Sequence, residues 1–224
     1  MQPEPFANEV ALVAILRGIA PERAVAVADV LYRAGIRIIE VPLNSPDPFA
    51  SIAALAAGRQ PDCLIGAGTV LHVEDVRRTH EAGGRLIVAP NCDGEVIRTT
   101  LRLAMQVLPG FATATEAFTA IHAGARQLKL FPAVSYGPRH LKALSAVLPG
   151  PVRVLPVGGI AAQDIPDWLA AGAAGFGFGS ELFRPDYGLA EIEQRARRLV
   201  QALHEAQRRL AQQSTPSGLL PPTE

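Results

Sequence analysis

The sequence predicts an α/β protein and, within that class, a compact (β/α)8 TIM barrel. Short runs rich in Val, Ile and Leu alternate with longer alanine-rich helical runs, and the alternation occurs eight times. This order is typical of a parallel sheet with right-handed crossovers. Eight units in roughly 170 residues fit a barrel. A doubly wound open sheet is the alternative, but the turn LRGIAPER after the first run lacks a glycine-rich dinucleotide pattern.

The predicted strands begin about 20 to 27 residues apart, which leaves room for one helix and two turns between neighbours. In chain order they are 13–18 (VAILRG), 36–43 (IRIIEVPL), 63–70 (CLIGAGTV), 85–91 (RLIVAPN), 105–111 (MQVLPGF), 126–132 (RQLKLFP), 152–159 (VRVLPVGG) and 175–180 (GFGFGS).

The helices between these strands have recognisable ends. One begins at Pro21 and stops at Gly35, and another has Thr113 as N-cap and Glu116 three residues later, the pattern of a capping box. The units YRAGIR, HEAGGR, IHAGAR and LAAGAAG each predict a helix that ends in Ala-Gly and turns into the next strand. A long final helix is expected over about 190–213.

We expect one domain over residues 1–212 and a disordered Pro/Ser-rich tail over 213–224.

Acidic and basic residues balance at 21 each, so nucleic acid is not an expected partner. The N-terminus resembles no signal peptide, and no apolar run approaches the ~20 residues of a membrane span. Two cysteines without metal-ligand spacing indicate a cytoplasmic protein with no structural metal.

Lys129 lies between Leu128 and Leu130 in a predicted buried strand, although the chain has only one other lysine, Lys142. Burial disfavours the charged amine and lowers its pKa, and a neutral amine can attack a ketone. Arginine could not serve, because it stays protonated. A lysine that reaches from the strand end to solvent is the alternative. If Lys129 points inward, strand alternation places Phe131 on the same side.

Three further residues stand at the carboxyl ends of strands, where barrels place their active sites. Glu40 lies in an apolar run and could move protons or pair with an arginine. The planar guanidinium of Arg17 could bind a carboxylate, or it could form a salt bridge with Glu40. Thr69 could add a hydroxyl to the same group or be structural.

Two glycine clusters lie at strand ends: PVGGI (156–160) at the end of the seventh predicted strand and GFGFGS (175–180) at the eighth. Loops at these places commonly bind phosphate through backbone amides, although glycines also suit tight turns. Lys129, Glu40, Arg17 and Thr69 would thus lie near a phosphate-binding site. This combination predicts a Schiff-base enzyme acting on a phosphorylated keto acid.

The chain also resembles the class I aldolases that cleave 2-keto-3-deoxy-6-phospho sugar acids. The resemblance rests on VAILRGI, IIEVPLNSP, LIGAGTVL, LIVAPN, PGFATATEAFTAIHAGA, LKLFPA, VLPVGGI and GFGFGS, which follow one another from about residue 12 to 184. It implies an imine on Lys129, proton transfer by Glu40, a homotrimer, and no metal or organic cofactor. The implied products are pyruvate and D-glyceraldehyde 3-phosphate. The implied substrate-binding residues are Arg17, Thr69, Pro90, Phe131, Val157, Gly158, Gly159, Gly179 and Ser180.

Two branches of this family handle C4 epimers of the substrate. The gluconate-type branch usually carries Thr-Leu-Arg-Thr after the glutamate and Pro-Thr-Gly-Gly at the seventh strand, whereas VPLNSP and PVGGI are similar to the galactonate-type branch. A gluconate-type aldolase of the Entner–Doudoroff pathway is the alternative, and a non-aldolase phosphate-binding barrel is the second. Phe178 departs from the smaller residues expected beside Gly179, and an inward ring would narrow the phosphate site.

Overall fold

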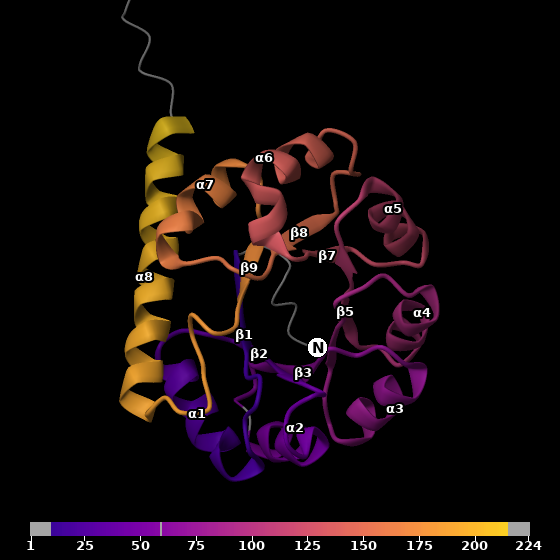
Figure 1. Ribbon diagram of the computed structural model, residues 1–224, viewed down its shortest axis with the longest axis vertical. Coiled ribbons are helices and arrows are strands. Elements are labelled where there is room, and N and C mark those ends of the chain that lie inside the picture. Colours follow the sequence, from indigo (N-terminus) through magenta and orange to yellow (C-terminus); the bar gives the residue numbers. More distant parts are fainter. Residues whose placement is uncertain (1–9, 59, 215–224) are drawn as a thin grey trace, which may run out of the picture.

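Parallel strands line the interior of the molecule, and helices surround them (Figure 1). The computed structural model describes residues 10–58 and 60–214. The strands are β1 (Ala11–Ile15), β2 (Ile38–Pro42), β3 (Leu64–Gly68), β4 (Leu86–Val88), β5 (Gln106–Leu108), β6 (Gly110–Phe111), β7 (Gln127–Leu130), β8 (Arg153–Pro156) and β9 (Gly175–Phe178). Every predicted strand is present, so the α/β class with a parallel arrangement is confirmed.

The strands form two sheets rather than one continuous sheet. One has the order β5-β4-β3-β2-β1-β9, and the other has the order β6-β7-β8. Two sets of backbone contacts join them: a bridge between Val157 and Gly177, and a hydrogen bond from Gly110 N to Asn91 O of 3.1 Å. The sheets therefore curl around a shared interior.

Pro109 divides the predicted strand 105–111 into β5 and β6. Proline has no backbone N–H to donate to a ladder, so β5 pairs with β4 on one side and β6 pairs with β7 on the other. The carbonyl of Pro109 accepts a hydrogen bond of 2.8 Å from Lys129 N, which ties the break to β7.

The helices form a ring around the strands, and α8 runs along the outside of α1 and α7 (Figure 1). They are α1 (Pro21–Arg33), α2 (Pro48–Gly58), α3 (Val73–Glu81), α4 (Gly94–Arg102), α5 (Ala114–His122), α6 (Ala133–Ser145), η1 (Ala162–Asp164), α7 (Ile165–Ala170) and α8 (Leu189–Ser214). Residues 213 and 214, predicted to begin a disordered tail, are the last residues of α8, and residues 215–224 lie outside the described residues. No helix in residues 10–58 and 60–214 is long and apolar enough to span a membrane.

The four Ala-Gly helix ends share one backbone conformation. Their glycines have positive φ angles, which glycine adopts without the steric cost that a Cβ imposes; these are Gly35 (104°), Gly83 (87°), Gly124 (107°) and Gly172 (98°). The predicted turns into the next strand are therefore confirmed.

Alternating strand residues separate two apolar layers. One face packs against the helices, and Phe176 and Phe178 belong to that layer. The other face fills the interior with a smaller cluster, formed by Ala11, Val13, Ile38, Leu64, Leu86, Val88, Leu108 and Leu155. Phe178 is 1% exposed and faces outward, so it does not narrow the glycine-rich site.

The capping box at α5 gives a test of the fold. Glu116 N donates to Thr113 Oγ1, and Thr113 N donates to Glu116 Oε2 at 2.8 Å. We expect Thr113→Ala to lower the free energy of unfolding by about 1 kcal/mol in urea titrations, because an N-cap acceptor is lost. The control is Thr115→Ala in the exposed first turn of the same helix. Equal destabilisation by both substitutions would contradict the capping account.

Candidate active site

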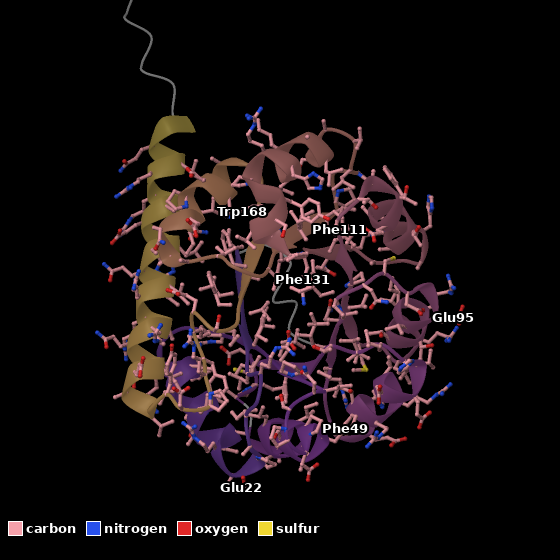
Figure 2. The ribbon with its side chains drawn as sticks, in the orientation of Figure 1. Glu22, Phe49, Glu95, Phe111, Phe131 and Trp168 are labelled. Carbon is pink, nitrogen blue, oxygen red and sulfur yellow. The ribbon has the colours of Figure 1, made fainter. Side chains whose placement is uncertain are left out.

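A cavity of about 710 Å³ opens at the carboxyl ends of β1, β7, β8 and β9. Eight of the predicted site residues line it: Arg17, Lys129, Phe131, Val157, Gly158, Gly159, Gly179 and Ser180. Figure 2 shows Phe131 near the centre of the helix ring, whereas Glu22 and Glu95 lie at its outer edge. The cavity therefore lies at the mouth of the strand interior, where the sequence predicted the site.

Lys129 points into the interior from the middle of β7. Lys129 is 5% exposed, and its Nζ lies 4.7 Å from the centre of the Phe131 ring. Strand alternation had predicted that these two side chains share a face, and they do. Because burial removes water from the ammonium form, the pKa of Lys129 lies below its ordinary value. The amine still borders the cavity, so it is buried but reachable.

Glu40 occupies the same interior from β2 and is 2% exposed. Its carboxylate lies directly over Gly68 of β3: a Cβ added at Gly68 would be 1.2 Å from Glu40 Oε2. Only glycine leaves room for the carboxylate at this position. Glu40 Oε2 is buried without a hydrogen-bond partner among the described residues. Burial raises the pKa of Glu40 to about 7, although the positive charges of Lys129 and Arg17 oppose the rise.

The alternative role of Glu40, a structural salt bridge with an arginine, is not observed. Among residues 10–58 and 60–214, neither Glu40 nor Lys129 lies within 4.0 Å of an oppositely charged group. The two side chains nevertheless influence each other, since each shifts the pKa of the other toward the charged form. Desolvation outweighs this attraction for both groups, so the pKa of Lys129 is lowered and that of Glu40 is raised to about 7.

Arg17 follows β1 and reaches over the mouth of the interior. Its guanidinium donates to Asn44 Oδ1 and, at 3.4 Å, to Thr69 Oγ1. Thr69 has a φ of 57°, an uncommon conformation for a β-branched residue. The structure thus brings the predicted pair Arg17 and Thr69 together, and Asn44 joins them.

Backbone amides gather at the glycine end of the cavity. Gly158 and Gly159 have φ angles of 97° and 75°. Within the described part of the chain, the N–H groups of Gly158, Gly159, Gly179 and Ser180 donate to no other protein group. Unpaired N–H groups that line one cavity make a suitable site for an anion.

The remaining predicted residues form the walls. Val157 is 4% exposed and packs close to Gly177, where an added Cβ would lie 2.7 Å from Val157 Cγ2. Pro90 follows β4, and its backbone approaches Gly110, the partner of Lys129 in the β6–β7 ladder. Pro90, Glu40 and Thr69 adjoin the interior but do not line the 710 Å³ cavity.

Four residues near the site were not predicted: Asn44, Gly68, Arg184 and Arg195. Arg195 pairs with Glu191, whereas Arg184 forms no ion pair among the described residues and its guanidinium carbon lies 5.6 Å from the centre of the Tyr187 ring. With Arg17, these arginines give the cavity a positive lining against one acidic residue, Glu181. This charge favours an anionic ligand.

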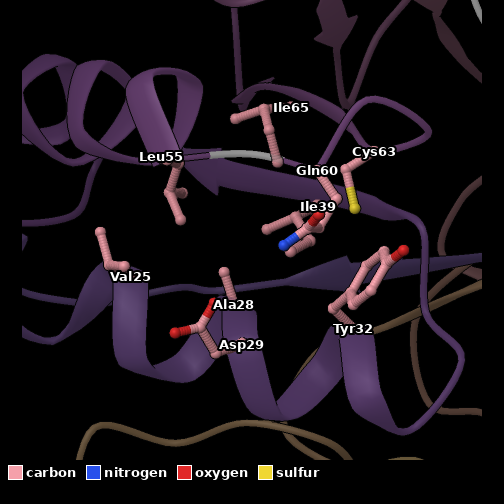
Figure 3. Close-up of a pocket in the computed structure, with 10 residues that line it drawn as sticks. Val25, Ala28, Asp29, Tyr32, Ile39, Leu55, Gln60, Cys63 and Ile65 are labelled. Carbon is pink, nitrogen blue, oxygen red and sulfur yellow. The ribbon is translucent and has the colours of Figure 1, made fainter.

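A second cavity, between α1 and α2, has a volume of only about 20 Å³ (Figure 3). Burial raises the pKa of Cys63, which lines it, to about 11, so the thiol is protonated at neutral pH. No cluster of three or more His, Cys, Asp or Glu able to hold a metal occurs in residues 10–58 and 60–214.

A reachable amine and a proton-exchanging carboxylate inside a parallel α/β fold are features of an enzyme that works through a lysine imine. The model of the family "KDPG and KHG aldolase" matches residues 5–195. The chain therefore belongs to the KDPG and KHG aldolase family and is an aldolase, a lyase.

Individual relatives agree with this assignment. The chain is 46% identical over 195 residues to 2-dehydro-3-deoxy-6-phosphogalactonate aldolase of Escherichia coli K12, covering 87% of this chain and 95% of the relative. A solved structure of native KDPGal superposes with a TM-score of 0.88 at 45% identity, covering 90% and 98% of the two chains. KDPG aldolase from Legionella pneumophila, solved with pyruvate captured as a covalent carbinolamine, has a TM-score of 0.75 at 27% identity, covering 90% and 95%.

The raised pKa of Glu40 predicts a stability effect with a definite sign. The carboxyl titrates at its ordinary value of 4.5 in the unfolded chain and at about 7 in the folded protein. Between these values the folded state binds more protons, so the free energy of unfolding falls as the pH rises. We expect Glu40→Gln to be more stable relative to the parent at pH 8 than at pH 4.5, by about 3 kcal/mol in urea unfolding.

Glu22→Gln, on the exposed face of α1, is the matched control for this comparison. If Glu40→Gln shows the same relative stability at both pH values, or if Glu22→Gln reproduces its gain, the buried-carboxylate account is wrong.

Proposed function

We propose that the chain cleaves 2-dehydro-3-deoxy-6-phosphogalactonate to pyruvate and D-glyceraldehyde 3-phosphate in galactonate breakdown. The observation that carries this proposal is the Lys129 amine, which is buried, has a lowered pKa and still borders the cavity. The galactonate-type relatives support the choice of substrate.

Lys129 begins the reaction. Its neutral Nζ attacks the C2 ketone of the substrate, and the resulting carbinolamine loses water to give a protonated imine. The C3–C4 bond then breaks, and its electron pair moves toward the imine nitrogen. This leaves an enamine of pyruvate on Lys129 and releases D-glyceraldehyde 3-phosphate. Phe131, beside Nζ, keeps the amine in an apolar surrounding.

Glu40 moves the protons. As the C3–C4 bond breaks, its carboxylate accepts the proton of the C4 hydroxyl through a water molecule. It then returns a proton to C3 of the enamine, and hydrolysis of the imine frees pyruvate and the lysine. A carboxyl whose pKa is about 7 serves both steps near neutral pH, because neither protonation state is rare.

Two groups of residues hold the two anionic ends of the substrate. Arg17 and Thr69 bind the carboxylate, for which the planar guanidinium is suited. The N–H groups of Gly158, Gly159, Gly179 and Ser180, with the Ser180 hydroxyl, bind the phosphate. Phe131, which lines the cavity, and Pro90, which adjoins the interior, supply apolar surface beside the reacting carbons. The reaction requires no metal or organic cofactor.

Val157 selects the epimer. A threonine at this position could donate to the C4 hydroxyl in one configuration, whereas the apolar valine withholds that bond. Withholding it favours the galactonate-type substrate over the gluconate-type substrate.

We also propose a closed (β/α)8 barrel, in which β5 and β6 together make one strand, as a single domain over residues 1–212. The Val157–Gly177 bridge and the Gly110–Asn91 hydrogen bond support closure. A homotrimer is proposed from the family resemblance. Cytoplasmic localisation is consistent with the free thiols of Cys63 and Cys92.

Borohydride reduction in the presence of pyruvate tests the imine. We expect one reduced pyruvate adduct on Lys129, detected by peptide mass spectrometry, because a buried amine with a lowered pKa condenses more readily than an exposed lysine. Lys142→Ala, which removes the only other lysine, should still be labelled, whereas Lys129→Ala should not. Absence of an adduct on Lys129 would support a non-aldolase phosphate-binding barrel instead.

The epimer assignment is tested with the two phosphorylated acids in parallel. We expect the parent to have the higher kcat/KM for the galactonate-type epimer. Val157→Thr should shift the ratio of the two kcat/KM values about tenfold toward the gluconate-type epimer, the value of one hydrogen bond. Activity of the parent on the gluconate-type epimer alone would establish the gluconate-type enzyme.

A further inference from the structure

Arg17 is held by neutral hydrogen-bond acceptors. Its Nη1 donates to an amide oxygen, Asn44 Oδ1, and its Nη2 donates to a hydroxyl, Thr69 Oγ1. In residues 10–58 and 60–214, no carboxylate lies within ion-pair distance of Arg17. Seven other arginines do pair with carboxylates: Arg33, Arg37, Arg77, Arg78, Arg98, Arg195 and Arg197.

Neutral acceptors have a different effect from a carboxylate partner. They fix the plane of the guanidinium by hydrogen bonding, but they leave its positive charge uncompensated. A guanidinium has five N–H donors, so Asn44 and Thr69 leave donors free for a further anion. Since Arg17 lines the cavity together with Lys129, these donors are available to a ligand held beside the amine.

The segment after β2 also holds the backbone on both sides of Arg17. Leu16 N donates to Glu40 O at 3.0 Å, and Gly18 N donates to Ser45 Oγ at 2.9 Å. Ser45 is 8% exposed, and its own N–H donates to Pro42 O, which closes the turn that carries Asn44. One segment, 40–45, therefore places the guanidinium and the Glu40 carboxylate relative to each other.

We propose that Asn44 is a positioning residue that sets Arg17 for the carboxylate of the keto-acid substrate, and that its neutrality is required for this task. The inference rests on the proposed function, in which Arg17 binds that carboxylate. Asn44 acts through Arg17 and has no direct part in the bond-breaking steps. An aspartate in its place would hold Arg17 equally well but would compete with the substrate for the positive charge.

The test uses pyruvate as the probe and borohydride trapping at Lys129 as the readout. Asn44→Ala should raise the half-saturating pyruvate concentration about tenfold, the effect of one hydrogen bond to a charged group, and change the maximal trapping rate less than about twofold. The melting temperature should stay unchanged, because Asn44 is exposed. In an Arg17→Met background, Asn44→Ala should have no further effect.

Asn44→Asp tests whether the neutrality of Asn44 matters, because aspartate keeps the hydrogen-bond acceptor for Arg17 but adds a negative charge. The proposal predicts a half-saturating pyruvate concentration at least as high as that of Asn44→Ala, whereas a purely structural acceptor would be rescued by aspartate. Parent-like pyruvate dependence in Asn44→Ala, an undiminished effect of Asn44→Ala in the Arg17→Met background, or rescue by aspartate would each overturn the proposal.

Labelling of the parent protein distinguishes failure of the proposed function from failure of the positioning role of Asn44. If the parent forms no adduct on Lys129, the proposed function fails before Asn44 is tested. If the parent is labelled and Asn44→Ala behaves like it, only the positioning role of Asn44 fails.

Discussion

The burial of two ionisable side chains in one apolar interior is the constraint on which the site depends. Lys129 and Glu40 are shielded from water by the strands around them, and the loss of hydration shifts their pKa values in opposite directions. The amine loses its proton more easily and the carboxyl keeps its proton longer. A less basic Lys129 amine and a Glu40 carboxyl with a pKa of about 7 are two consequences of the same desolvation.

The fold makes room for these groups through strand alternation and missing side chains. Inward positions of β2 and β7 carry Glu40 and Lys129 at the level where the apolar cluster ends. Gly68 leaves the space that the Glu40 carboxylate occupies. The local cost of burying the carboxylate is offset by the many apolar contacts of the two layers, as expected where stability is given up for activity.

Much of this arrangement was predictable from local rules. The inward direction of Lys129 and Phe131 follows from the period of a strand, and the helix ends follow from Ala-Gly units. The division of the fifth strand at Pro109 was not predicted, although the missing N–H of proline is a local signal. The contact of Asn44 with Arg17 joins segments 27 residues apart. The fit of Glu40 over Gly68 likewise depends on strand register, so neither contact could be deduced from local sequence.

The most direct test of the central claim is the pKa of the Lys129 amine itself. Lys142→Arg leaves a protein with a single lysine, so the ¹⁵N resonance of its Nζ can be followed through a pH titration. The account predicts a midpoint clearly below the ordinary lysine value of 10.5. A midpoint at or above 10.5 would contradict it, because burial would then not have made the amine easier to deprotonate.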